Sequence, residues 1–230
     1  MFDRGSPACE AAREVPEVCH SRSVPHCYVS HVKVRELAVP DSYEISTDVF
    51  PDDRGLFLNP FRADVLSEAT GHRLTVAQTN HSASRRGVVR GVHFALVPPG
   101  QAKYVYCPRG AALDVVVDIR VGSPTFGRHD VVRLDDRDFR AVYLAEGIGH
   151  AVVALQDDTV VSYLCSTGYD PAREKGISPA DPELALPWPT EVEPLLSPRD
   201  RAAPTLREAA EQGLLPTYEE CRAQYARNRS

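Results

Sequence analysis

The sequence lacks the features that mark several common classes of protein. No apolar run approaches the roughly 18 residues that a membrane-spanning helix needs. The N-terminal segment carries acidic residues and no apolar stretch, unlike a secretory signal. The net charge is −6 and the pI about 5.8, whereas general nucleic-acid-binding proteins are more often basic. We therefore expect a cytoplasmic protein that binds neither a membrane nor nucleic acid.

Catalytic motifs with short, fixed spacing are also missing. The sequence contains no Gly-x-Gly-x-x-Gly loop, no P-loop, no Gly-x-Ser-x-Gly elbow and no Cys-x-x-Cys pair. Dinucleotide chemistry and phosphoryl transfer thus have none of their usual sequence support.

The six cysteines do not indicate a disulfide framework in a chain of 230 residues without a signal. Cys107 and Cys165 lie in apolar, strand-like runs, so we expect both in the core. The grouping Cys19-His20 and His26-Cys27 suggests zinc, but its spacing matches no common finger. We expect residues 1–30 to be a flexible N-terminal extension. Residues 31–230 would be one domain with a C-terminal helical segment.

Strand-like runs separated by turn signals fill residues 74–167 almost completely. Many short strands at regular spacing favour an antiparallel sandwich or barrel over a parallel sheet. Within ALDVVVDIR, Leu113, Val115, Val117 and Ile119 alternate with more polar positions, which predicts two differently buried faces. A few short helices accompany the strands, at residues 61–72, ending near Gly71, and at residues 204–215. The predicted class is all-β, with two shorter strands at the turn in VFPDDRGLFLNPF.

Two histidines stand where strands would line a pocket. His93 follows RRGVVRG and precedes Lys103, and His150 follows the turn EGIG. The form Gly-x-x-His resembles half of a cupin metal motif, but an earlier strand of a metal-binding cupin carries His-x-His and a Glu. Here Phe94 and Ala95 follow His93, and one imidazole cannot supply three or four ligands. We therefore expect a metal-free, cupin-type antiparallel jelly roll.

Strand parity makes a specific demand on this pocket. Arg90 and His93 are an odd number of positions apart, so a regular strand would direct their side chains to opposite faces. Both face one pocket only if the strand is kinked, and Gly91 is where a bulge is tolerated. The sequence therefore predicts an irregularity at Gly91.

Ordered motifs give the strongest signal. RGVVRGVHF, QAKYVYCPRGAALDVVVDIRVGSPTFG, YLAEGIGHAVVAL, SYLCSTGYDP and LLSPRD, preceded by DDRGLFLNPF and QTNHSAS, resemble the dTDP-4-dehydrorhamnose 3,5-epimerase family. The resemblance covers about residues 32–215 and is greatest to antibiotic-pathway 5-epimerases and 3,5-epimerases of dTDP-4-keto-6-deoxyhexoses. It implies a homodimer that needs no cofactor and epimerises such a sugar at C5, C3 or both.

The same resemblance implies roles for individual residues. His93 would remove the proton beside the 4-keto group, with Asp200 orienting its imidazole. Lys103 would stabilise the enolate oxygen, Tyr163 would return a proton from the opposite face, and His150, with Asp114 as a possible partner, would support the pocket. The nucleotide and sugar would be held by Arg54, Phe57, Asn59, Gln78, Asn80, Arg90 and Tyr169, with Arg54 reaching a neighbouring subunit.

Several positions depart from the family pattern, among them Tyr143-Leu144-Ala145, where the family has Trp-Ile-Pro. Asn59 replaces a usual Glu, Ala95 replaces a Gln, and Gly168 replaces the first aromatic of a Tyr-Tyr pair, leaving Tyr169. The change at Gly168 would open the sugar subsite.

Other readings of the residues remain. Tyr163 would be an ordinary core tyrosine, Asp200 a residue at a helix N-terminus, and Lys103 a charge on an edge strand. At the level of the whole protein, the alternatives are a non-catalytic sugar-nucleotide-binding cupin and a metal-dependent cupin enzyme.

Overall fold

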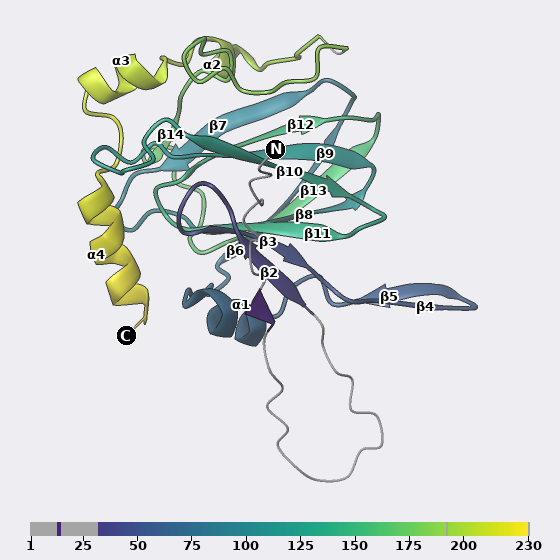
Figure 1. Ribbon diagram of the computed structural model, residues 1–230. Coiled ribbons are helices and arrows are strands. Elements are labelled where there is room, and N and C mark those ends of the chain that lie inside the picture. The colour runs from purple at the N-terminus through teal and green to yellow at the C-terminus, as the bar shows by residue number, and fades with distance from the viewer. Residues whose placement is uncertain (1–12, 15–31, 192, 230) are drawn as a thin grey trace, which may run out of the picture.

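The computed structural model describes residues 13–14, 32–191 and 193–229. The candidate zinc group Cys19-His20 and His26-Cys27, and nearly all of the expected extension 1–30, lie outside the described residues. Two antiparallel sheets face each other and a two-stranded hairpin projects from them (Figure 1). This architecture confirms the all-β, jelly-roll prediction.

The first sheet has seven strands in the spatial order β1-β2-β3-β11-β8-β13-β6. In that order they span Arg13–Glu14, Lys33–Glu36, Ser42–Ser46, Arg140–Leu144, Lys103–Arg109, Thr159–Cys165 and Gln78–Ser84. The second sheet has five strands in the order β10-β9-β12-β7-β14. They span His129–Asp135, Ala111–Val117, Gly149–Ala154, Val89–Ala95 and Glu174–Gly176. The projecting hairpin consists of β4 (Val49–Asp52) and β5 (Gly55–Leu58).

The strands expected within residues 74–167 are present as β6 to β13, with one correction. Residues 74–77 were expected to begin a strand, but β6 begins only at Gln78. The reason is the length of the neighbouring strand: β13 ends at Cys165, which pairs with Gln78, and only Ala77 still donates a hydrogen bond to the carbonyl of Cys165. Residues 74–76 thus lie beyond the end of β13.

Alternation along β9 separates two apolar cores, as its sequence predicts. Val116 points into the core between the two sheets, while Val115 and Val117 join a cluster on the outer face of the five-stranded sheet. Residues of the later segment, such as Ile177 and Leu206, cover that outer face. The strand β9 is therefore buried on both faces. Cys107 and Cys165 are buried free thiols, as expected.

Four helices accompany the sheets in the described residues. They are α1 (Ala63–Thr70), α2 (Pro198–Arg201), α3 (Leu206–Glu211) and α4 (Tyr218–Arg229). The predicted end of the first helix is confirmed, since Gly71 caps α1 with φ 72°. The helix expected over residues 204–215 is shorter, and begins with a Thr205–Glu208 capping box. No helix in these ranges is long and apolar enough to span a bilayer.

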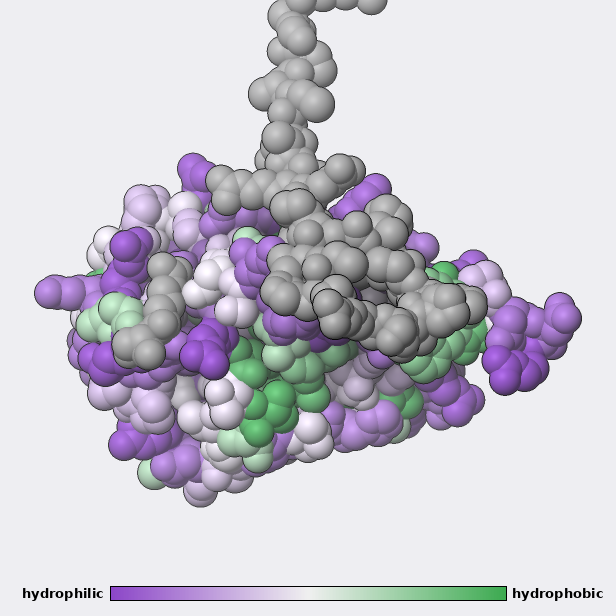
Figure 2. Space-filling model, turned by 90° about the horizontal axis from the view of Figure 1, so that it is seen from below, coloured by the Kyte–Doolittle hydropathy of each residue, from purple (hydrophilic) through white to green (hydrophobic). Residues whose placement is uncertain are grey.

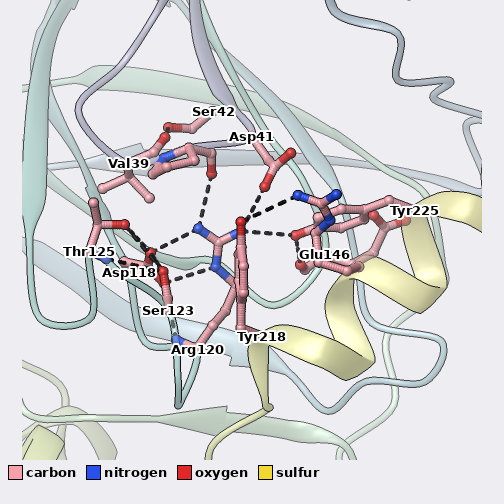
Figure 3. Close-up of polar contacts among 12 residues, drawn as sticks. Val39, Asp41, Ser42, Asp118, Arg120, Ser123, Thr125, Glu146, Tyr218 and Tyr225 are labelled. Atoms are coloured by element: carbon pink, nitrogen blue, oxygen red, sulfur yellow. Dashed lines mark hydrogen bonds and ion pairs between the residues drawn. The ribbon is translucent and has the colours of Figure 1, made fainter.

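Helix α4 lies along one side of the jelly roll and is joined to it through a buried arginine (Figure 3). The side chain of Arg120 is fully buried and donates hydrogen bonds to Asp118, Asp41 and the hydroxyl of Tyr225 in α4. That hydroxyl in turn donates to the backbone carbonyl of Glu146 at 2.6 Å. Glu146 precedes the glycine turn before β12, so the network connects α4 to the strand that carries His150.

Candidate functional site

Strand β7 is irregular at Gly91, as strand parity predicts. His150 pairs with His93 and Val152 pairs with Arg90, so two positions along β12 match three along β7. Side chains two apart share a face, so Arg90 and His93 also share the inner face. Gly91 has φ 130°, and a Cβ there would lie 2.5 Å from the Cβ of Ala151, so the bulge requires glycine.

The imidazole of His93 is paired with a carboxylate from a distant part of the chain. Its Nε2 lies 2.7 Å from Oδ1 of Asp200, in α2, 107 positions later. Ser197 caps α2 by accepting a hydrogen bond from the backbone N–H of Asp200 at 3.1 Å. Burial would raise the pKa of Asp200, but the hydrogen bond and charge interaction with His93, together with Ser197 and Arg199, hold that pKa below its usual value. Asp200 is therefore an ionised partner that can orient the imidazole and stabilise an imidazolium.

A second pair of the same kind lies beside the first. Nε2 of His150 lies 2.7 Å from Oδ2 of Asp114, and both residues are buried. His150 and His93 are direct cross-strand partners. The inner face of the five-stranded sheet thus presents two adjacent imidazoles, each held by its own carboxylate.

The opposing sheet contributes a lysine and a tyrosine. Lys103 in β8 is only 6% exposed, and among the described residues its ammonium group has no hydrogen-bond or ion-pair partner. Since β8 lies between β11 and β13, Lys103 is not an edge-strand charge. Burial raises the pKa of Tyr163 in β13. Tyr163 pairs with Val105, which is two positions from Lys103, so the two side chains share one face of the seven-stranded sheet. A protonated phenol and an ammonium group therefore face the two histidines.

Three further predicted residues lie close to Tyr163. Asn80 in the edge strand β6 is the direct partner of Tyr163. The side-chain amide of Gln78 donates to Oδ1 of Asn80 at 2.7 Å, and its oxygen accepts from the backbone N–H of Tyr169 at 2.8 Å. The Tyr169 ring is 60% exposed. These polar and aromatic groups lie together at the β6 edge of the seven-stranded sheet.

The remaining predicted residues are not brought to His93 within one chain. Arg54, Phe57 and Asn59 belong to the β4–β5 hairpin and its end, and the hairpin projects away from both sheets (Figure 1). Its hydrophilic tip extends to the right in Figure 2. Phe57 is 63% exposed. These three residues line a cavity of about 460 Å³ together with Arg62 of the body.

One residue of the site was missed from sequence. Glu174 in β14 pairs with Ala95, so its side chain shares the face of His93. It comes from a loop-rich, proline-rich segment whose pattern gave no signal. Ala95 and Gly168, two of the departures from the family pattern, line one cavity of about 170 Å³ with Glu174.

The arrangement as a whole is suited to general acid–base chemistry. No set of three or more histidine, cysteine, aspartate or glutamate side chains is placed to hold a metal ion in the described ranges. Two carboxylate-bound imidazoles occupy one wall, and a lysine and a protonated tyrosine occupy the other. Opposed donors and acceptors are what inversion at a carbon centre requires. The fold and the site together define a jelly-roll enzyme of the isomerase class.

Comparison with known proteins specifies the family. The model of the dTDP-4-dehydrorhamnose 3,5-epimerase family matches residues 36–208. A dTDP-4-dehydrorhamnose 3,5-epimerase of Mycolicibacterium smegmatis is 52% identical over 189 residues, covering 82% of this chain and 93% of that protein. The chain belongs to the dTDP-4-dehydrorhamnose 3,5-epimerase family.

Solved structures agree with this assignment. A 4-keto-6-deoxy sugar epimerase from the novobiocin biosynthetic gene cluster of Streptomyces spheroides has a TM-score of 0.81 and 54% identity, covering 87% of this chain and all of that one (100%). A 3'-monoepimerase from Streptomyces bikiniensis, in complex with dTDP-quinovose, has a TM-score of 0.82 and 47% identity, covering 84% and 98%. Relatives thus include epimerases with different regiochemistry.

Proposed function

We propose that this protein epimerises a dTDP-4-keto-6-deoxyhexose in deoxysugar biosynthesis, by moving a proton at a carbon beside the ketone. The observation that carries the proposal is the opposition of His93–Asp200 on one sheet to Tyr163 and Lys103 on the other. A base and an acid on opposite walls act on opposite faces of a sugar held between them.

The proton inventory is simple. His93 takes the proton from the carbon beside the carbonyl, the electron pair moves into the C–C bond, and negative charge develops on O4. Lys103 stabilises that oxygen, and Asp200 stabilises the imidazolium. Tyr163 then gives its proton to the same carbon from the other face, which inverts the configuration. The phenol is reprotonated and the imidazolium deprotonated by solvent, so the reaction consumes no co-reactant.

The diphosphate and nucleoside call for cationic and aromatic groups near this pair. Arg90 offers bidentate hydrogen bonds to phosphate oxygens, and Gln78, Asn80 and Tyr169 lie beside it at the open side of the sheets. His150, held by Asp114, supports the sugar and the developing oxyanion.

Arg54, Phe57 and Asn59 act, in this proposal, in the site of a second subunit. The hairpin that carries them projects beyond its own jelly roll, with Leu56 51% and Phe57 63% exposed, which supports a homodimer with exchanged hairpins. Mixing Arg54→Ala protein with His93→Ala protein should restore activity, because one site of a mixed dimer then holds both native residues. A mixture as inactive as its components, in a sample shown to exchange subunits, would contradict the exchange.

The regiochemistry is proposed to include C3. Both the 3,5-epimerase and the 3'-monoepimerase among the relatives act there by name. Incubation with dTDP-4-keto-6-deoxyglucose in deuterated water, followed by NMR, should show deuterium at C3, with deuterium at C5 as well if the enzyme is a double epimerase. His93→Asn should show no incorporation. A folded wild-type protein that incorporates deuterium at neither carbon would refute the epimerase proposal.

A further inference from the structure

The side chain of Arg90 has a single anchor in the described residues. Its Nε donates a hydrogen bond to Oγ of Ser84 at 3.1 Å. Ser84 ends β6 on the seven-stranded sheet, while Arg90 lies in β7 on the five-stranded sheet. The bond therefore crosses between the two sheets at the β6 edge.

This bond uses only Nε of Arg90 and leaves the two terminal nitrogens of the guanidinium available to a ligand. An arginine binds an anion in bidentate fashion through a pair of its N–H groups. Ser84 occupies Nε, and the two terminal nitrogens have no partner among the described residues. Arg90 is exposed and would otherwise be a flexible side chain in water. A carboxylate partner would neutralise the charge of the guanidinium. The neutral hydroxyl of Ser84 holds the guanidinium and leaves its positive charge available to an anion.

The bond also directs Arg90 toward the reacting groups. Because of the bulge at Gly91, Arg90 shares the inner face with His93. The serine that holds its Nε lies in β6, the strand in which Asn80 is the cross-strand partner of Tyr163. The exposed side chain thus reaches toward the opposing sheet, where Tyr163 also lies.

We propose that Ser84 is a positioning residue: it fixes the guanidinium of Arg90 so that both terminal nitrogens face the diphosphate of the bound nucleotide sugar. This inference rests on the proposed function, in which Arg90 binds that diphosphate. Ser84 itself does not touch the substrate. Its effect is to order a mobile side chain before binding, and ordering one such side chain is worth about two- to tenfold in affinity.

The first test is direct binding of dTDP, measured by calorimetry with the purified protein. Ser84→Ala should weaken dTDP binding about two- to tenfold, and Ser84→Thr, which keeps the hydroxyl, should restore it. Ser82→Ala is the matched control, because Ser82 is two positions earlier on the same face of β6 and donates only to the carbonyl of Val161. It should bind dTDP like the wild type. In turnover, Ser84→Ala should raise KM and leave kcat within about twofold.

The second test separates positioning from direct contact. In an Arg90→Ala background, Ser84→Ala should have no further effect on dTDP affinity, because the guanidinium that Ser84 positions is then absent. Equal weakening in both backgrounds would show that Ser84 acts on the ligand itself and would overturn the inference, as would unchanged affinity in Ser84→Ala alone. Since dTDP binding needs no turnover, these outcomes are distinct from failure of the epimerase proposal, which would appear as absent deuterium incorporation in wild-type protein.

Discussion

Replacing Arg120 by methionine should destabilise the fold strongly, although Arg120 lies outside the proposed site. Its side chain has 0% exposure. Nε and Nη2 bind the two carboxylate oxygens of Asp118, both at 2.8 Å, and Nη1 binds Asp41 at 2.9 Å and Tyr225 at 3.3 Å. Nη2 also binds the carbonyl of Pro40 at 3.0 Å (Figure 3). Methionine keeps apolar volume but removes every one of these donors.

The magnitude follows from what the substitution leaves behind. Burial would raise the pKa of Asp118, but hydrogen bonds from Arg120, Ser123 and Thr125 hold it below the usual value, so the carboxylate is charged. Removing one member of a buried ion pair costs about 3–5 kcal/mol, because a buried charge is left without compensation. For a chain of this size, 1 kcal/mol corresponds to about 2–4 °C, so Tm should fall by about 6–20 °C.

Thermal and urea unfolding at neutral pH would measure this loss. All samples should have the same protein concentration, because the Tm of any protein that self-associates depends on concentration. Arg133→Ala is the matched control: Arg133 also pairs with an aspartate two positions away, at 2.9 Å, but its side chain is 49% exposed. Because the arginine of this pair is exposed to solvent, although Asp135 is buried, the pair contributes about 0–1 kcal/mol. If Arg120→Met costs no more than Arg133→Ala, the network of Figure 3 does not stabilise the fold and the reasoning is wrong.

Three further substitutions test the site and its support. Asp200→Asn should lower kcat by about 10²–10⁴-fold with little change in KM, because His93 loses the charged partner that orients its imidazole. Deuterium exchange rates measured by NMR would test this, and a loss of kcat below about threefold would contradict it. Gly91→Ala should lower Tm and abolish turnover, since the added Cβ would lie 2.5 Å from that of Ala151; a stable, active variant would refute the need for the bulge. Burial raises the pKa of the Glu146 carboxyl in the folded protein. As the pH rises above the pKa of Glu146 in the unfolded chain, ionisation of this carboxyl therefore lowers the free energy of unfolding. Glu146→Gln should therefore raise Tm relative to wild type at pH 8 and lose that advantage near pH 4, and equal differences at both pH values would contradict this assignment.

The sequence by itself determined where most of the strands lie, and it determined that the strand carrying Arg90 and His93 is irregular at Gly91. Strand alternation is a local property, so β7 to β13 could be predicted from short windows of residues. The odd separation of Arg90 and His93 required a kink, and Gly91 was the one residue between them that tolerates it. The order of the motifs indicated the family because those residues serve a shared chemistry.

Only the tertiary structure decided which distant groups meet. The pairing of His93 with Asp200 depends on where α2 packs against β7, and no local pattern encodes that. The pairing of β14 with β7 set Glu174 opposite Ala95, and the end of β13 left residues 74–76 without a neighbouring strand. Sheet order and register also placed Tyr163 across the pocket from His93, and directed the β4–β5 hairpin away from both. The physical reason is that side-chain direction follows from local backbone geometry, whereas proximity between strands follows from the packing of the whole core.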